Sequence, residues 1–236
     1  MRFWNMAPDP GSPEDGSLEI TGEIVAEPSW FFGGDECVAR DIVEQLKGYR
    51  NVTVRINSPG GDVMAGAAIY TALMEHPGHV TVVVTALAAS AASVIAMAGE
   101  KIIMSPTAYM MIHNPWTVAV GDSRELRKTA KVMDEIAEGL INAYELRTGK
   151  SRDELQRMLD NETWMSARTC VDEGFADEIL GEEAAGPAVK MSAKAHGFEE
   201  IAARVREDRR PAEAEEARKR AEIAERARII AAMYAN

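Results

Sequence analysis

The chain has 236 residues, of which 46% are hydrophobic and 27% charged, a balance that supports a soluble globular fold with a core of ordinary size. Its formal net charge is −12, which argues against nucleic-acid binding because neutralising phosphates requires a basic surface. The two cysteines, Cys37 and Cys170, belong to no C-x-x-C pair and lie near no metal-ligand histidines. We therefore expect two reduced, buried thiols, no metal site and no cofactor.

Residues 1–17 are rich in Pro, Gly, Asp and Ser, which predicts a loose N-terminal arm without the apolar core of a signal peptide. Residues 18–25 alternate apolar and polar side chains, as a half-buried strand does. Residues 35–45 carry apolar side chains at helical spacing, and residues 52–56 form a short β-branched strand. The segment 57–61, Asn-Ser-Pro-Gly-Gly, predicts a turn before the next helix.

The longest apolar stretch, residues 80–98, is interrupted by Ser90 and Ser93 and lacks the density of large aliphatic side chains that a membrane span needs. We interpret it as a buried strand followed by a helix of small residues, and we expect a cytoplasmic protein with no membrane partner. Asp122 and Glu125 have the spacing of a capping box at the start of a long amphipathic helix. The further elements expected are a helix at 62–74, strands at 101–104 and 109–112, and helices at 122–147 and 151–160.

Strands that alternate with helices predict an α/β fold with a parallel sheet covered by helices, built from repeated β-β-α units. The composition changes after Leu180. Residues 181–198 are rich in Gly and Ala and are expected to be a linker, and residues 199–236 are dense in Glu, Arg and Ala. A thin apolar stripe in the last segment predicts a charged helical tail.

Ser90 is the candidate nucleophile, because it follows a predicted strand and opens a helix whose neighbouring residues are small. A serine hydroxyl attacks a carbonyl only when a base removes its proton, and the developing oxyanion needs hydrogen-bond donors. His113 ends a strand before Asn114-Pro115 and is the candidate base, while the Pro-Gly-Gly turn at 59–61 offers unobstructed N–H groups. Taken singly, Ser90 also fits a helix N-cap, and His113 also fits a structural histidine.

Four segments resemble, in the family's order, the proteolytic subunit of Clp protease, ClpP. They are 57–61 (Asn-Ser-Pro-Gly-Gly), 86–99 around Ser90, 111–115 (Met-Ile-His-Asn-Pro) and 164–180, which begins Trp-Met-Ser-Ala. The resemblance runs from residue 18 to 180 and implies a ClpP-like serine peptidase domain with the ClpP/crotonase-type spiral fold. It matches Ser90 with the nucleophile and His113 with the base.

The resemblance also implies an oxyanion hole formed by the N–H groups of Gly61 and Ala91. Ser93 is the alternative nucleophile, but it has no counterpart in the family motif. In the family, the third residue of the catalytic triad, after the serine and the histidine, is an Asp. It lies four residues before the serine of a Ser-Ala motif. Here that serine is Ser166, and the matching position holds Glu162. A glutamate also orients a histidine in Ser-His-Glu triads.

Asp160, two residues before Glu162, is the alternative acid, and both also fit solvated charges at a helix end. In the family, a long helix forms a handle by which two rings interlock, and residues 122–147 match it. The adjoining strand corresponds to residues 117–121. The resemblance thereby implies substrate-backbone binding by Gly60, Thr117, Val118 and Ala119. It also implies closed homo-oligomeric rings, commonly heptamers stacked in pairs.

No P-loop motif is present, so the chain is not its own ATPase. Ordinary family members receive unfolded chains from a separate AAA+ unfoldase, but residues 1–6 do not resemble the family's axial-loop segment. The aromatic start, Glu162 at the acid position and the charged tail resemble the phage-encoded branch more closely. Its members process capsid or scaffold proteins inside the prohead.

Two other function classes are kept beside the serine endopeptidase. A crotonase-type acyl-CoA enzyme shares the spiral fold but uses carboxylates for acid and base catalysis, so it does not require the Ser90 and His113 pair. A non-catalytic capsid assembly protein would retain a degenerate site and act through its C-terminal helix. Peptide hydrolysis, thioester turnover and capsid assembly distinguish the three classes.

Overall fold

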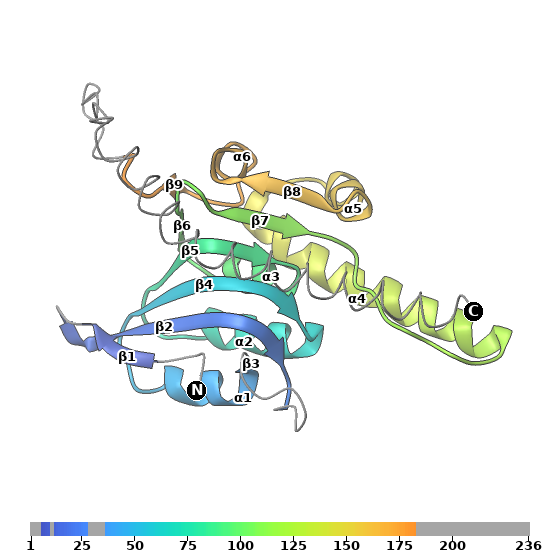
Figure 1. Cartoon of the computed structure of the whole chain (residues 1–236), viewed down its shortest axis with the longest axis horizontal. Helices are drawn as coiled ribbons and strands as arrows, with labels where there is room; N and C mark the ends of the chain where they lie inside the picture. Colours follow the sequence, from blue (N-terminus) through green and yellow to red (C-terminus); the bar gives the residue numbers. More distant parts are fainter. Residues whose placement is uncertain (1–5, 10–11, 28–35, 183–236) are drawn as a thin grey trace, which may run out of the picture. The chain divides into compact units, whose positions relative to one another are not determined.

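In a computed structural model, structure is described for residues 6–9, 12–27 and 36–182 (Figure 1). The chain divides into one unit of residues 1–184 and a second of residues 185–236. The predicted helical tail at 199–236 and nearly all of the predicted linker lie outside the described residues. Within the described ranges, no helix is both long enough and apolar enough to cross a membrane.

The described strands form one sheet whose central pairs are parallel, as the alternation of strands and helices predicted. Its order is β1-β2-β4-β5-β6-β9, with β3 paired to β2, and with β7 paired to both β5 and β8 (Figure 1). The antiparallel pairs are β1 with β2 and β7 with β8. The strands are β1 (Met6–Asp9), β2 (Ser12–Val25), β3 (Glu36–Val38), β4 (Val52–Gly61), β5 (Val80–Ala89), β6 (Lys101–Met104), β7 (Tyr109–Ile112), β8 (Thr163–Ser166) and β9 (Glu178–Ile179).

Alternation of side chains sets which face of β4 enters the core, because successive residues of a strand point to opposite faces. Val52, Val54 and Ile56 are buried, whereas Arg55 between them is exposed. The strand beside it, β5, buries residues on both faces along its middle, as strands of a covered parallel sheet do. The predicted hydrophobic patterns at 52–56 and 80–85 are therefore confirmed.

Side-chain caps mark the start of two of the described helices that border the site. Asp62 caps the second helix by accepting a hydrogen bond of 2.7 Å from the Ala65 N–H. Asp122 and Glu125 form both halves of the predicted capping box. The helices are α1 (Ala39–Leu46), α2 (Val63–Met74), α3 (Ala91–Ala96), α4 (Ser123–Thr148), α5 (Arg152–Asp160) and α6 (Ala167–Asp172).

Helix α4 packs on the rest of its unit only through its C-terminal half. Its buried residues are Ala137, Ile141, Ala143 and Tyr144, whereas its first turns are exposed. Figure 1 shows the N-terminal end of α4 extending past the ends of the strands. This arrangement agrees with the protruding handle helix that the sequence predicted.

Three local predictions are corrected by the structure. Residues 6–9 and 12–17, expected as a loose arm, form β1 and the start of β2, because backbone pairing with β2 and β4 orders them despite their Pro and Gly content. Residues 57–61 extend β4 rather than forming a separate turn, since they continue the parallel pairing with β2. Residues 117–121, expected as the handle strand, have no regular secondary structure and no described strand beside them to pair with.

Candidate active site

Ser90 lies at a sharp connection between a strand and a helix. β5 ends at Ala89, α3 begins at Ala91, and Ser90 between them has φ 53° and ψ −126°. Such a positive φ is strained for a residue with a side chain, and strained backbone concentrates at functional sites. The Ser90 N–H donates a 2.9 Å hydrogen bond to the carbonyl of Met111 on β7, which holds the connection in place.

The hydroxyl of Ser90 makes no capping hydrogen bond, so it does not serve as the N-cap group that the sequence also allowed. Instead, the Ser90 Oγ lies 2.8 Å from the Nε2 of His113. β5 and β7 are parallel neighbours, so their carboxyl ends meet at one edge of the sheet and bring the two residues together. Nucleophilic attack assisted by a general base requires such a pair, in which a serine hydroxyl donates its hydrogen bond to an imidazole nitrogen.

The end of β4 packs against Ser90 through two glycines in conformations that side chains rarely adopt. Gly60 has φ 94°, and a Cβ atom there would lie 2.6 Å from the Ala89 carbonyl oxygen and 2.7 Å from the Ser90 Cβ. Gly61 has φ 148°, and its Cβ would lie 2.1 Å from the carbonyl oxygen of Ile24. Only glycine therefore allows the end of β4 to lie this close both to β2 at Ile24 and to the connection at Ser90.

Ser58 fixes the same strand end from inside the core. Its side chain is fully buried, donates a 2.6 Å hydrogen bond to the Gly22 carbonyl and accepts one of 3.1 Å from the Gly60 N–H. The Gly60 N–H is thus already bonded within the protein. The sequence predicted Gly60 to be a substrate-binding residue. In the structure, its lack of a side chain is what allows β4 to approach Ser90 closely.

The two candidate acids have different partners. Asp160 accepts hydrogen bonds of 2.8 Å from Asn114 and 2.8 Å from Gln156, and these two bonds, the Asn114 bond first, lower the pKa of Asp160. Glu162 accepts a 3.2 Å hydrogen bond from the indole N–H of Trp164. Within the described residues, no hydrogen bond joins His113 to either carboxylate.

Strand register nevertheless brings Glu162 to the histidine. β7 and β8 are antiparallel, and their last pair is Ile112 with Thr163. His113 directly follows this pair in the chain and Glu162 directly precedes it, so both residues adjoin the same end of the ladder. Glu162 also has φ 46°, so it is held in the left-handed region at the point where the chain enters β8.

A cleft of about 640 Å³ opens beside Ser90 and His113. Gly60, Gly61 and Thr117 line it, as the sequence suggested, whereas Val118 and Ala119 are not among its lining residues and are exposed. The sequence did not identify the cleft's apolar side chains, which come from α2, β7, α4 and the segment after β7. They are Met64, Met111, Met133, Ile136 and Trp116.

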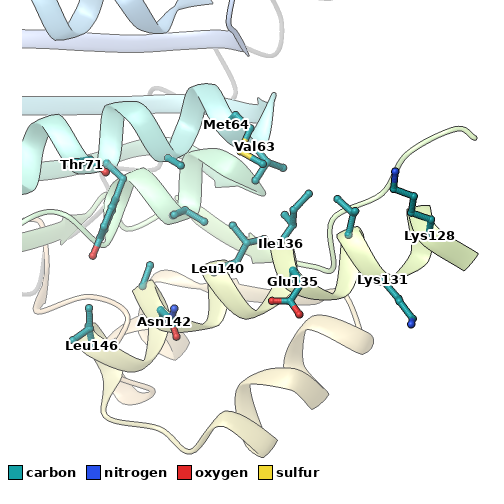
Figure 2. A pocket seen from close by; sticks show the side chains of 16 residues that line it. Val63, Met64, Thr71, Lys128, Lys131, Glu135, Ile136, Leu140, Asn142 and Leu146 are labelled. Carbon is teal, nitrogen blue, oxygen red and sulfur yellow. The ribbon is translucent and has the colours of Figure 1, made fainter.

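A second hollow, an apolar groove of about 580 Å³, lies between α2 and α4. Figure 2 shows Val63 and Met64 on α2 facing Ile136 and Leu140 on α4, with Lys128 and Lys131 toward the exposed end of α4. Val63, Met64 and Ile136 line both the groove and the cleft, so the two hollows adjoin. No single segment of sequence predicts them, because residues from elements far apart in the chain line each hollow.

No group of His, Cys, Asp and Glu in the described part of the chain has the arrangement of a metal site. Cys37 and Cys170 are buried free thiols, as predicted. Burial raises the pKa of each to about 12.

A comparison with known families matches residues 35–183 to the Clp protease family. The chain belongs to the Clp protease family. It is 33% identical over 133 residues to the ATP-dependent Clp protease proteolytic subunit of Bacteroides fragilis, a match that covers 56% of this chain and 64% of that protein. It is 34% identical over 129 residues to proteolytic subunit 1 of Protochlamydia amoebophila, covering 53% of this chain and 63% of the relative.

The chain thus spans just under two thirds of the length of these relatives. Among solved structures, it is similar to a point mutant of ClpP1 from Listeria monocytogenes, with a TM-score of 0.60 and 29% identity. That match covers 70% of this chain and 90% of the Listeria chain. The ClpP-type fold predicted from the sequence is therefore confirmed, and at the level of the family the relatives are peptidases.

Proposed function

We propose that this chain is a serine endopeptidase in which Ser90 is the nucleophile and His113 the general base. The observation that carries the proposal is the 2.8 Å separation of the Ser90 Oγ and the His113 Nε2 at the strained connection between β5 and α3. In the first step, the Nε2 accepts the hydroxyl proton while the Oγ attacks the carbonyl carbon of the peptide bond. The protonated imidazole then gives the proton to the leaving amine, and water hydrolyses the acyl-enzyme by the same route.

The oxyanion formed in each step is stabilised by the N–H groups of Gly61 and Ala91. Two observations support these donors. They match the family motif, and the end of β4 packs against the start of α3, since a Cβ on Gly60 would lie 3.0 Å from the Ala91 nitrogen. Donors aimed at the developing charge usually contribute the largest part of the rate enhancement. The resemblance and this close contact thus favour the same pair of donors.

Glu162 is the third member of the triad, with its carboxylate orienting the Nδ1–H of His113. The pairing of β7 and β8 supports this role, because their last pair, Ile112 with Thr163, adjoins both His113 and Glu162. Asp160 is disfavoured because Asn114 and Gln156 already bond its Oδ1. A rotation of the Glu162 side chain away from Trp164 completes the triad, and it costs one exposed hydrogen bond of 3.2 Å.

The cleft favours substrates with a large apolar side chain beside the scissile bond. Met64, Met111, Met133 and Ile136 line it, and flexible methionines adapt to varied apolar shapes. Met64 is 62% exposed and Trp116 is 76% exposed, so apolar surface is available for a substrate to bury. A chain bound along the cleft gains its binding energy mainly from these contacts.

The active form is a homo-oligomeric ring in the cytoplasm. The exposed apolar residues Val118 and Val120, together with the exposed half of α4, offer surface that a second copy covers. An AAA+ unfoldase would be needed only for folded substrates. Size-exclusion chromatography with light scattering measures the number of subunits in the oligomer. Casein hydrolysis with and without ATP and an unfoldase shows whether the protein requires an unfoldase.

The natural substrates are phage capsid or scaffold proteins. Glu162 at the acid position, the aromatic start and the charged C-terminal segment support this assignment. The test incubates the purified protein, and its Ser90→Ala variant, with purified phage capsid and scaffold proteins. Site-specific cleavage by the wild type alone supports the assignment, and intact capsid proteins in both incubations contradict it.

Fluorophosphonate labelling tests the peptidase assignment itself. We expect one label on Ser90, its loss in Ser90→Ala and His113→Ala, and hydrolysis of apolar peptides only by the wild type. Ser105→Ala is the matched control, since it removes a serine hydroxyl after β6, away from the cleft, and is expected to keep both labelling and activity. A folded wild type with neither labelling nor hydrolysis would overturn the assignment.

A further inference from the structure

A buried hydroxyl pair connects the proposed nucleophile to the long helix α4. The Ser93 Oγ lies 2.6 Å from the carbonyl oxygen of Ser90 and 2.8 Å from the hydroxyl of Tyr144. Ser93 is fully buried, and Tyr144 is only 1% exposed. Ser93, a rival nucleophile by its position in the sequence, is therefore closed off from substrate and engaged on both sides.

The direction of these hydrogen bonds follows from the groups present. A carbonyl oxygen only accepts, so Ser93 must give its single hydroxyl hydrogen to Ser90. The hydrogen in the second bond then comes from Tyr144, which donates to the Ser93 Oγ. Burial raises the pKa of the Tyr144 phenol, so this group remains a donor at neutral and moderately alkaline pH.

The Ser90 carbonyl and the Ala91 N–H belong to the same peptide group. Because a trans peptide is planar, the C=O and N–H bonds point in opposite directions and turn together. A contact that fixes the direction of the Ser90 carbonyl therefore also fixes the direction of the Ala91 N–H. Ser90 itself is strained, with φ 53° and ψ −126°, so this peptide group needs external contacts to keep its orientation.

Two backbone hydrogen bonds and one side-chain hydrogen bond hold the Ser90 carbonyl, and the side-chain bond is the shortest of the three. It accepts from the Ser93 N–H at 2.9 Å and from the Val94 N–H at a long 3.4 Å. The Ser93 hydroxyl adds the shortest of the three bonds, at 2.6 Å. Tyr144 is in turn anchored by its place in the buried half of α4 and by its ring contact with Phe175, whose centroid is 5.8 Å away.

We propose that Ser93 and Tyr144 are positioning residues: Tyr144 donates to Ser93, Ser93 donates to the Ser90 carbonyl, and this relay aims the Ala91 N–H at the oxyanion. The inference rests on the proposed serine peptidase function. It gives α4, whose other end extends beyond the sheet, a direct connection to the catalytic peptide group. Displacement of α4 would therefore reduce turnover without removing any catalytic residue.

The test uses Tyr144→Phe, Ser93→Ala and the double variant in the full chain. Peptide kcat and KM, thermal unfolding and binding of a peptidyl boronate are measured for each. The boronate forms a tetrahedral adduct whose oxygen occupies the oxyanion hole, so its affinity reports the aim of the donors. We expect kcat and boronate affinity to fall about tenfold, with KM and product-peptide binding unchanged.

The double variant separates positioning from packing. Each single variant leaves a buried polar group without one partner, whereas the double variant removes both hydroxyls, so it should regain thermal stability. Positioning requires that its kcat stays low despite this recovery. If kcat recovers together with stability, or if the single variants keep wild-type kcat and boronate affinity, the relay has no positioning role.

Tyr49→Phe is the matched control, because Tyr49 is a partly buried tyrosine that packs against the core away from the cleft. It should keep wild-type kcat. The wild type and Ser90→Ala are assayed in the same series. Hydrolysis by the wild type that Ser90→Ala abolishes upholds the peptidase assignment, so a failure of the relay is recognised separately from a failure of the proposed function.

Discussion

Asp160 accepts a 2.8 Å hydrogen bond from the side-chain amide of Asn114, the residue that follows His113 in the chain. The same Oδ1 atom accepts from Gln156, also at 2.8 Å. Asp160 therefore stabilises the segment after the histidine, while Glu162 directly precedes Thr163, which pairs with Ile112 just before the histidine. This division of roles leads to the first prediction.

Glu162→Gln is expected to lower kcat by about 10²- to 10⁴-fold, because an amide no longer stabilises the protonated imidazole. Asp160→Asn is the matched change of the other carboxyl and is expected to lower kcat only a few-fold. Steady-state hydrolysis of an apolar peptide measures both. A larger loss in Asp160→Asn than in Glu162→Gln would assign the acid to Asp160.

Asp160 also predicts a dependence of stability on pH. Its hydrogen bonds to Asn114 and Gln156 lower its pKa in the folded protein below the ordinary value of 3.8. The associated stabilisation is therefore present above about pH 4 and is lost as the pH falls through the folded pKa. Urea unfolding from pH 5 to pH 2 should show a steeper loss in the wild type than in Asp160→Asn, and parallel curves would contradict this prediction.

Gly60→Ala is expected to reduce kcat by about a hundredfold, because its Cβ would lie within 2.7 Å of the Ser90 Cβ and displace the nucleophile. It should also destabilise the fold by about 1–3 kcal/mol, owing to the φ of 94°. Gly48→Ala is the control, since its nearest contact is an ordinary 3.7 Å to the Gln45 carbonyl. Peptide kinetics and thermal unfolding measure the two effects, and an active Gly60→Ala variant would contradict the packing argument.

The buried thiols are expected to be unreactive in the folded protein. Burial raises the pKa of Cys37 and of Cys170 to about 12, so almost no thiolate exists at pH 8. Ellman's reagent should therefore react with neither thiol until the chain is unfolded, and iodoacetamide should leave peptidase activity intact. Rapid reaction of a thiol in the native state, or inactivation by iodoacetamide, would show a cysteine more accessible than its burial allows.

The apolar cleft predicts the side chain preferred before the scissile bond. Peptides with Leu or Met at this position should be cleaved roughly 10- to 100-fold faster, in kcat/KM, than peptides with Asp, as expected for burying one large apolar side chain. Ile136→Asp introduces a charge into the cleft from α4 and should narrow this difference. Equal cleavage of all peptides by the wild type would mean that the cleft does not bind this side chain.

Elements with a local physical cause were predictable from the sequence. The capping box at Asp122 and Glu125, the alternation in β4 and the small-residue helix after Ser90 each follow from neighbouring residues, and the structure contains all three. The strands before Leu18 were missed because their Pro and Gly content is typical of a loose arm, and because β2 pairs with β4, which is remote in sequence. Residues 117–121 were predicted as a strand, yet strand structure requires a partner as well as suitable residues.

For the site, the sequence by itself determined the order of the motifs and, through them, the family and the roles proposed for Ser90 and His113. Tertiary structure decided the rest, because distances between residues far apart in sequence depend on packing. It separated the partners of Asp160 from those of Glu162, brought β4, β7, α2 and α4 together around the cleft, and buried Ser93 against Tyr144. The Ser93 hydroxyl, a rival nucleophile by its position in the sequence, is closed off from substrate because Tyr144 on α4 packs against it.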